Sequence, residues 1–237
     1  MKIEALYPEL TGDSGDRGNL AYLKMCAPDA EFIETGLFDE PLFSTEAPAL
    51  IIMGTMTEST QEKVVSALEK YRGRLSTLID QGVPMLFTGN AGELLFNSII
   101  DWDGREIPGL GLFPFTAKRE QYYRYNGLCL GKTAEGVTVT GFRSQFTTWS
   151  GDNSGCPFVE CERGRGLDAD SRFEGVRRNN AILTQQLGPL LVCNPDFTSW
   201  LLKLIGSNGS LVCEDSVREA FDYRLKRFRE PTISIDA

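Results

Sequence analysis

Side chains that act as nucleophiles, general bases or metal ligands are scarce in this sequence. None of its 237 residues is a histidine. Histidine is the usual base of Ser–His and Cys–His catalysis and the commonest zinc ligand, so imidazole-dependent chemistry is excluded. No two cysteines have the Cys-x-x-Cys spacing, and we expect reduced thiols, no metal and no cofactor. The six cysteines are Cys26, Cys129, Cys156, Cys161, Cys193 and Cys213.

One turn has the position at which many α/β enzymes carry a nucleophile. It follows the apolar run 83–88 and reads Gly89-Asn90-Ala91-Gly92. In such enzymes a Cys or Ser stands at a sharp turn after a buried strand. This turn holds neither, and its glycines also fit a purely steric role.

Charge and composition indicate which partners and which cellular compartment to expect. The net charge is −9, which disfavours nucleic acid and anionic membranes as partners. No apolar stretch approaches the roughly 20 residues that span a bilayer. The first residues lack the apolar core of a signal peptide, so we expect a cytoplasmic protein.

Short apolar runs alternate with helical patterns along the chain. This alternation predicts an α/β fold with a mostly parallel sheet, in one domain covering residues 1–237. Ligands of such sheets bind beyond the carboxyl ends of the strands, here the turns after residues 53, 88 and 186. Antiparallel strands are expected within 109–149 and a long loop at 150–174. Strands are expected at 1–6, 48–53, 83–88 and 181–186, and helices at 18–27, 57–81, 89–100, 196–205 and 214–227.

Four blocks in order carry a family resemblance: LYPELTGDSGDRGNL (6–20), LIIMGTMTESTQ (50–61), VPMLFTGNAGELLF (83–96) and the GPLL and NP elements of 173–202. Together they resemble the class I glutamine amidotransferases. The most similar group contains the glutaminase subunit of lipid II isoglutaminyl synthase and the cobyric acid synthase amidotransferases. The resemblance implies a flavodoxin-like three-layer sandwich. It also implies a bacterial pathway, either peptidoglycan or cobalamin synthesis.

The same alignment implies that the catalytic residues are gone. Gly89 stands at the position of the nucleophilic cysteine and Leu187 at that of the catalytic histidine. A γ-glutamyl thioester requires a thiolate, which glycine cannot supply. Cys129 and Cys193 are candidates for a substitute thiol, but a buried apolar role is the more common one.

Other family positions imply a former substrate site. Gly54 is retained in the turn that forms the oxyanion hole, whereas Thr55 and Met56 replace glycines there. Arg124 is the best match for the arginine that holds glutamine, with Arg119 as a competitor. The other positions assigned to substrate binding are Asn90, Glu93, which replaces a glutamine, and Gln145, which replaces a histidine.

These observations lead to three hypotheses. The first is an inactive subunit that acts as a structural or regulatory partner of a Mur-ligase-like synthetase. The second is a small-molecule module that binds an amino acid in the former glutamine pocket. The third is an enzyme with carboxylate chemistry built on Glu58 or Glu93.

Two expectations test this interpretation in three dimensions. Gly89 and Leu187 should lie close together at the ends of neighbouring strands. The aromatic segments 121–125 and 142–149 should expose an apolar surface to a partner, above all through Tyr122 and Tyr123.

Overall fold

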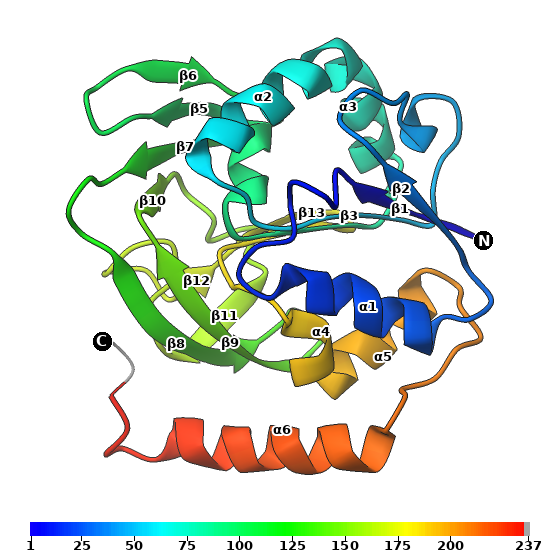
Figure 1. The fold of residues 1–237 in the computed structure, drawn as a ribbon. Helices are drawn as coiled ribbons and strands as arrows, with labels where there is room; N and C mark the ends of the chain where they lie inside the picture. Colours follow the sequence, from blue (N-terminus) through cyan, green and yellow to red (C-terminus); the bar gives the residue numbers. More distant parts are fainter. Residues whose placement is uncertain (235–237) are drawn as a thin grey trace.

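A six-stranded sheet forms the centre of the molecule (Figure 1). The computed structural model describes residues 1–234. The strand order is β13-β14-β4-β3-β1-β2, and all neighbours are parallel except β13 and β14. The strands are β1 (Lys2–Leu6), β2 (Glu31–Thr35), β3 (Leu50–Met53), β4 (Met85–Thr88), β13 (Val176–Arg178) and β14 (Ala181–Thr184).

Helices cover both faces of this sheet, as Figure 1 shows, which gives the three layers that the family resemblance implies. Apolar side chains from the two helical layers form one buried cluster on each face of the sheet. One layer contains α2 (Glu58–Leu68) and α3 (Arg72–Asp80); the other contains α1 (Asp16–Cys26), α4 (Leu190–Cys193) and α5 (Pro195–Leu204). Helix α6 (Glu214–Arg229) lies outside the second layer.

Two smaller sheets flank the central one. The first has the order β10-β7-β5-β6 and the second β12-β11-β8-β9. Their strands are β5 (Phe96–Ile100), β6 (Glu106–Pro108), β7 (Phe113–Arg119), β8 (Tyr125–Lys132), β9 (Thr138–Gln145), β10 (Thr147–Ser150), β11 (Val159–Arg163) and β12 (Phe173–Glu174).

The expected helix at 89–100 is wrong. Residues Gly89–Leu95 form a 3₁₀ helix, and Phe96–Ile100 is strand β5. Leu94, Leu95 and Phe96 are all fully buried, and three consecutive buried residues do not fit one face of an α-helix.

Of three further expectations, two need correction and one is confirmed. The helix at 57–81 is divided at Glu69–Tyr71, where the Tyr71 ring packs edge-on against Phe43 at 5.5 Å. The antiparallel strands expected within 109–149 are confirmed by the pairs β7–β10 and β8–β9, and β7 also pairs in parallel with β5, which precedes this range. The expected loop at 150–174 contains β11 and β12, because Val159 and Cys161 alternate with exposed residues and face the core.

Strands β1, β3, β4 and β14 and helices α1, α5 and α6 are close to their expected bounds, whereas β2, β13 and α4 were not expected from the sequence. β3, β4 and β14 are buried along their whole length, as the continuous apolar runs indicate. Within residues 1–234, none of the helices combines the length and the apolar character that crossing a membrane requires.

Candidate functional site

A cavity of about 240 Å³, here called the small cavity, opens at the carboxyl ends of β4 and β14. It contains seven of the eight positions that the sequence assigned to the former active site. Gly54 is the exception. The seven are Gly89, Leu187, Thr55, Asn90, Glu93, Arg124 and Gln145.

Gly89 and Leu187 lie side by side, as the alignment predicts. Gly89 directly follows β4, and Leu187 follows the neighbouring strand β14. A Cβ atom built on Gly89 would lie 3.3 Å from Leu187 Cδ2. Gly89 has a φ of +57°, a left-handed conformation suited to a sharp turn after a strand. The backbone of the turn is therefore compatible with a nucleophile position, although its side chain is missing.

The space above Gly89 is filled by Thr55. A Cβ atom at Gly89 would lie only 1.8 Å from the methyl carbon of Thr55. The Thr55 hydroxyl donates to Asp13 O at 2.6 Å or to Asp16 Oδ2 at 2.7 Å, which holds the methyl group in this orientation. No residue larger than glycine fits at position 89 unless Thr55 moves.

The backbone amides of the turn after β3 are also occupied. Thr55 N–H donates to Asp16 Oδ2 at 2.7 Å, and Met56 N–H donates to Asn90 Oδ1 at 3.0 Å. Asn90 returns a bond from its Nδ2 to Met56 O at 2.8 Å. An oxyanion hole needs amides that point free into the site, so these two amides are committed elsewhere.

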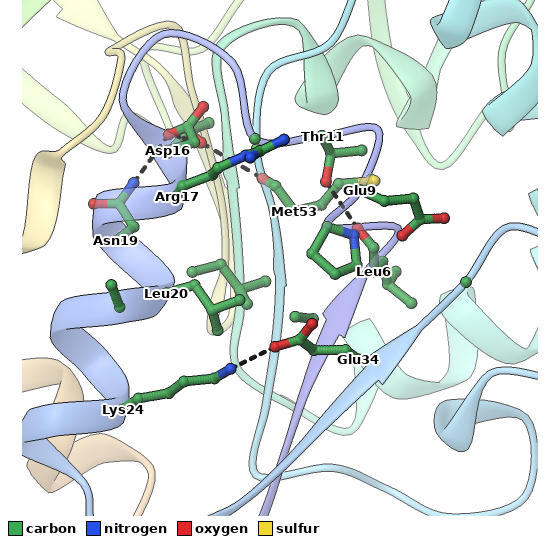
Figure 2. A pocket seen from close by; sticks show the side chains of 18 of the residues that line it. Leu6, Glu9, Thr11, Asp16, Arg17, Asn19, Leu20, Lys24, Glu34 and Met53 are labelled. Carbon is green, nitrogen blue, oxygen red and sulfur yellow. Dashed lines mark hydrogen bonds and ion pairs between the residues drawn. The ribbon is translucent and has the colours of Figure 1, made fainter.

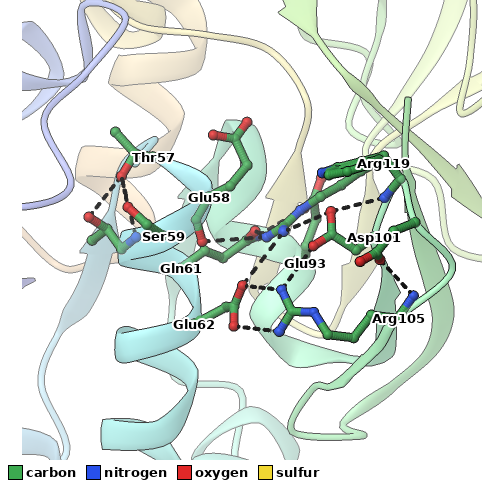
Figure 3. A network of polar contacts seen from close by, with 12 residues as sticks. Thr57, Glu58, Ser59, Gln61, Glu62, Glu93, Asp101, Arg105 and Arg119 are labelled. Atoms are coloured by element: carbon green, nitrogen blue, oxygen red, sulfur yellow. Dashed lines mark hydrogen bonds and ion pairs between the residues drawn. The ribbon is translucent and has the colours of Figure 1, made fainter. Parts of the chain in front are cut away.

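Glu93 is the fully buried charged group of the small cavity (Figure 3). Its Oε1 accepts from Thr147 Oγ1 at 2.5 Å and from Trp149 Nε1 at 2.9 Å. Its Oε2 accepts from Gln61 Nε2 at 2.8 Å. Burial raises the pKa of the Glu93 carboxyl, although the three donors favour the ionised form.

Arg119 lies behind this carboxylate rather than in the cavity. Its Nη2 donates to Gln61 Oε1 at 2.7 Å, and its Nη1 is 3.4 Å from Asp101 Oδ1. Asp101 in turn contacts Arg105, which pairs with Glu62 at the surface (Figure 3). Arg119 thus supports the Gln61–Glu93 bond, and of the two competing arginines Arg124 is the one that lines the cavity.

The rim of the cavity combines exposed and buried polar groups. Arg124 is exposed, and its guanidinium lies 4.7 Å from the centre of the Phe146 ring. Gln145 donates from Nε2 to Thr147 O at 2.6 Å. Gln185 is buried, and within the described residues its Nε2 has no hydrogen-bond partner. An unpaired buried donor is costly unless something else satisfies it.

Gly54 has a packing role. A Cβ atom there would lie 2.3 Å from Thr11 O and 2.5 Å from Asp16 Cβ. Its assignment to substrate binding therefore finds no support from its position, because close backbone packing already requires glycine.

Two buried carboxylates that position the site were not assigned from the sequence. Asp16 accepts bonds from Thr55, from Thr88 Oγ1 at 2.7 Å and from Asn19 Nδ2 at 2.9 Å, which ties α1 to the ends of β3 and β4. Glu174 accepts from Thr184 Oγ1 at 2.9 Å and from the amide of Gln185, and so holds the end of β14. Burial raises the pKa of both carboxyls.

Two of the partners of Asp16, Thr55 and Thr88, are distant in sequence, so the role of this carboxylate is visible only in the fold.

The candidate substitute thiols lie outside the small cavity. Cys129 is buried with its sulfur 3.6 Å from that of Cys161, and this contact together with burial raises the Cys129 pKa. Cys193 lines a separate hollow beside Arg224. Among residues 1–234, no cluster of three or more Cys, Asp or Glu side chains is arranged to hold a metal ion.

Sequence comparison finds one curated relative at a low level of identity. The GatD subunit of lipid II isoglutaminyl synthase (glutamine-hydrolyzing) from Staphylococcus aureus (strain N315) is 24% identical over 154 residues. The match covers 65% of this chain and 62% of GatD, so it spans less than two thirds of that relative. No protein-family model matches the chain.

Structure comparison finds the same fold in many solved structures, among them the following three. A glutamine amidotransferase matches with a TM-score of 0.59 and 16% identity, over 86% of this chain and 98% of that one. PurLQS from Thermotoga maritima matches with a TM-score of 0.56 and 14% identity, over 94% and 98%. A second glutamine amidotransferase, also from Thermotoga maritima, matches with a TM-score of 0.51 and 11% identity, over 96% and 97%. This chain therefore has the flavodoxin-like fold of glutamine amidotransferases and is similar in sequence to GatD at a low level of identity.

Proposed function

We propose that this chain is a catalytically silent amidotransferase-like subunit that acts as a partner of a Mur-ligase-like synthetase. One observation carries the proposal: the methyl group of Thr55 occupies the space that a side chain at Gly89 would need. A glutaminase that had lost only its cysteine would retain an empty place for it. Here the place is filled, which supports a site adapted to having no nucleophile.

Two further features support the absence of glutaminase activity. The amides of Thr55 and Met56 are bonded to Asp16 and Asn90, so the turn offers no free oxyanion donors from these residues. Leu187 stands where the base is expected and cannot accept a proton. With nucleophile and base both missing, only binding contributions would remain.

The partner part of the proposal rests on similarity to GatD and on the exposed aromatic side chains. GatD is a subunit of a glutamine-hydrolyzing synthase. Tyr122 and Tyr123 are 91% and 58% exposed, and Phe142 and Phe146 are 46% and 38% exposed. We call these four residues the aromatic rim. Tyr and Phe are enriched at protein interfaces, and Phe146 also lines the small cavity.

The experiment is co-expression of the chain with a Mur-ligase-like synthetase from the same genome. The two proteins should co-purify, and the complex should amidate its substrate with ammonium but not with glutamine as the nitrogen source. A complex that uses glutamine as well as ammonium would contradict silence. Failure to co-purify, with both proteins folded, would contradict the partner role.

A second candidate function is amino-acid binding in the small cavity. The unpaired Nε2 of buried Gln185 favours it, because a ligand oxygen would satisfy this donor. The volume of about 240 Å³ is slightly below the usual range for drug-sized ligands, which is about 300–1,000 Å³, and suits a smaller molecule. Calorimetric titration with glutamine and glutamate tests it, with Arg124→Ala expected to weaken binding and Arg17→Ala expected to leave it unchanged.

Carboxylate chemistry has less support. The Glu93 carboxylate already accepts three hydrogen bonds from protein donors, which leaves about one of its four acceptor sites for a substrate proton. Glu58 lines the cavity but is exposed, without the buried setting that usually tunes a catalytic carboxylate.

A further inference from the structure

A second, larger cavity lies on the other side of Asp16, between α1 and the sheet (Figure 2). Its volume is about 680 Å³, and we call it the large cavity. Strand β1 has β2 on one side and β3 on the other, so the strand order reverses between β1 and β3. Leu6 and Met53, the last residues of β1 and β3, both line the cavity. Crevices at this kind of topological switch point are the usual ligand sites of open parallel sheets.

The floor of the large cavity is apolar and its base is closed by an ion pair. Leu20 of α1 and Ala5 and Ile52 of the sheet line the cavity and belong to the apolar cluster on the α1 face of the sheet. Below them, Lys24 of α1 pairs with Glu34 of β2. The volume falls within the range of about 300–1,000 Å³ that is typical of small-molecule sites.

Arg17 extends over the mouth of this cavity from the first turn of α1 (Figure 2). In the part of the chain that the structure describes, its guanidinium makes no ion pair or hydrogen bond. A Cβ atom at Gly12 would lie 2.5 Å from Arg17 Cγ and 2.6 Å from its Nε, so glycine at position 12 makes room for the arginine side chain. The loop thus directs an uncompensated positive charge over the cavity.

Carboxylates stand on the opposite wall. Glu9 Oε1 accepts from Leu37 N–H at 3.2 Å, and Asp39 Oδ2 accepts from Gly36 N–H at 3.0 Å. These two oxygens lie 3.8 and 2.8 Å from the Cβ position of Gly36, so the two side chains are close together just after β2. Each carboxylate keeps its second oxygen free of partners within the described residues.

We propose that the large cavity binds a nucleoside phosphate. The phosphate contacts the Arg17 guanidinium, which suits phosphate through several parallel hydrogen bonds. The ribose hydroxyls donate to the free oxygens of Glu9 and Asp39, since a carboxylate after the second strand of a βαβ unit commonly binds ribose. The base packs on the apolar floor formed by Leu20, Ala5 and Ile52.

The other glycines of the GDRGN region do not form a phosphate loop. Cβ atoms at Gly15 and Gly18 would collide with Gly188 and Pro189, so these two glycines serve close packing of α1 against the segment before α4. The phosphate therefore depends on Arg17. This site shares no cavity with Gly89 and is independent of the proposed loss of glutaminase activity.

The test is calorimetric titration of the full chain with AMP, UMP, UDP, adenosine and inorganic phosphate. At least one nucleotide should bind with a stoichiometry of one, and adenosine and phosphate alone should each bind at least about tenfold more weakly. Arg17→Ala should weaken nucleotide binding about tenfold or more, because a charge-assisted bond to phosphate is lost.

Two further variants make the outcome specific. Gly12→Ala keeps the charge but displaces the Arg17 side chain, and it should also weaken binding. Arg124→Ala, in the small cavity, is the matched control and should leave nucleotide binding unchanged. Each variant's melting temperature is measured to confirm folding.

Three results would overturn the proposal. The first is no binding of any of these nucleotides at millimolar concentration. The second is inorganic phosphate binding as tightly as the nucleotides, which would leave an anion site without nucleoside recognition. The third is nucleotide binding that survives Arg17→Ala but is lost in Arg124→Ala, which would place the ligand in the small cavity.

Discussion

The small and large cavities lie at the same edge of the central sheet but differ in how their polar groups are used. In the small cavity, Thr55, Asn90 and Glu93 bond to neighbouring protein groups, and the methyl group of Thr55 fills the space above Gly89. In the large cavity, Arg17 has no partner among the described residues, and nothing comparable fills the volume of about 680 Å³.

Asp16 separates the two cavities and contributes to both. Its side chain lines the large cavity, while its Oδ2 bonds to Thr55, which lines the small one. The difference teaches that internal contacts can fill one part of the carboxyl edge of such a sheet, around Gly89, while an adjacent crevice stays open. The experiments below test each part of this contrast.

The largest effect on the stability of the fold is expected from the substitution Gly89→Ala. The new Cβ atom would overlap the methyl group of Thr55, and alanine is unfavourable at the positive φ of position 89. We therefore expect the unfolding free energy to fall by about 2–4 kcal/mol. Chemical denaturation measures it. The control is Gly104→Ala, which has a φ of +87° and open space around it, and should lose only about 1 kcal/mol. Equal losses at the two positions would show that the space above Gly89 is not filled.

The second effect tests whether Thr55 is the cause. Thr55→Ser removes the methyl carbon that would meet the new Cβ atom and keeps the hydroxyl bonds to Asp13 and Asp16. In the Gly89→Ala background it should restore about 1–2 kcal/mol, whereas in the native chain it should be mildly destabilising. Additive effects in this double-mutant cycle would mean that the two residues do not compete for space.

The third effect concerns the buried charge of the small cavity. Burial raises the pKa of Glu93 above its ordinary value of 4.5, so the folded protein binds this proton more tightly than the unfolded chain does. The resulting stabilisation of the folded protein is complete below pH 4.5. It is lost as pH rises through the raised pKa. Glu93→Gln does not titrate, so the stability of the native chain relative to this variant should fall as pH increases from about 4.5.

Denaturation curves at a series of pH values measure this difference in unfolding free energy. The control is Glu58→Gln, at the exposed rim of the same cavity, which should change the unfolding free energy little. A native chain that gains stability over Glu93→Gln with rising pH would show that the three hydrogen-bond donors outweigh burial.

The smallest effect on stability is expected from the aromatic rim. The double variant Tyr122→Ala/Tyr123→Ala should change the unfolding free energy by less than about 0.5 kcal/mol, because both side chains are exposed. The same variant should weaken co-purification with the synthetase, whereas Tyr223→Ala, exposed on α6, should not. Marked unfolding of the double variant would assign the tyrosines to the core instead.

The sequence was sufficient for the parts of the fold that depend on continuous patterns. The apolar runs of β3, β4 and β14 and the ordered blocks placed Gly89 beside Leu187, although the two residues are far apart in sequence. The prediction for the segment after Gly89 was wrong. Phe96 begins strand β5 and pairs with Phe113 of β7, and this strand pairing does not show in the local apolar pattern.

Side-chain contacts between distant segments could not be predicted from one sequence. The roles of Asp16 and Glu174 depend on hydroxyl and amide donors that only the fold brings near them. The collision between position 89 and Thr55 likewise depends on the rotamer that Asp13 and Asp16 impose. Tyr122 and Tyr123 are exposed as expected, whereas Tyr125 and Trp149, which belong to the same two aromatic segments, are buried in the core.

The most direct test of the central claim is the release of ammonia from glutamine, measured with the purified chain alone and with the synthetase and its substrates added. A filled nucleophile position and an absent base predict a rate equal to that of the buffer blank in both cases. Ammonia release above the blank that is abolished by mutating Cys129 or Cys193 would contradict the account and would locate glutaminase chemistry at a thiol outside the small cavity.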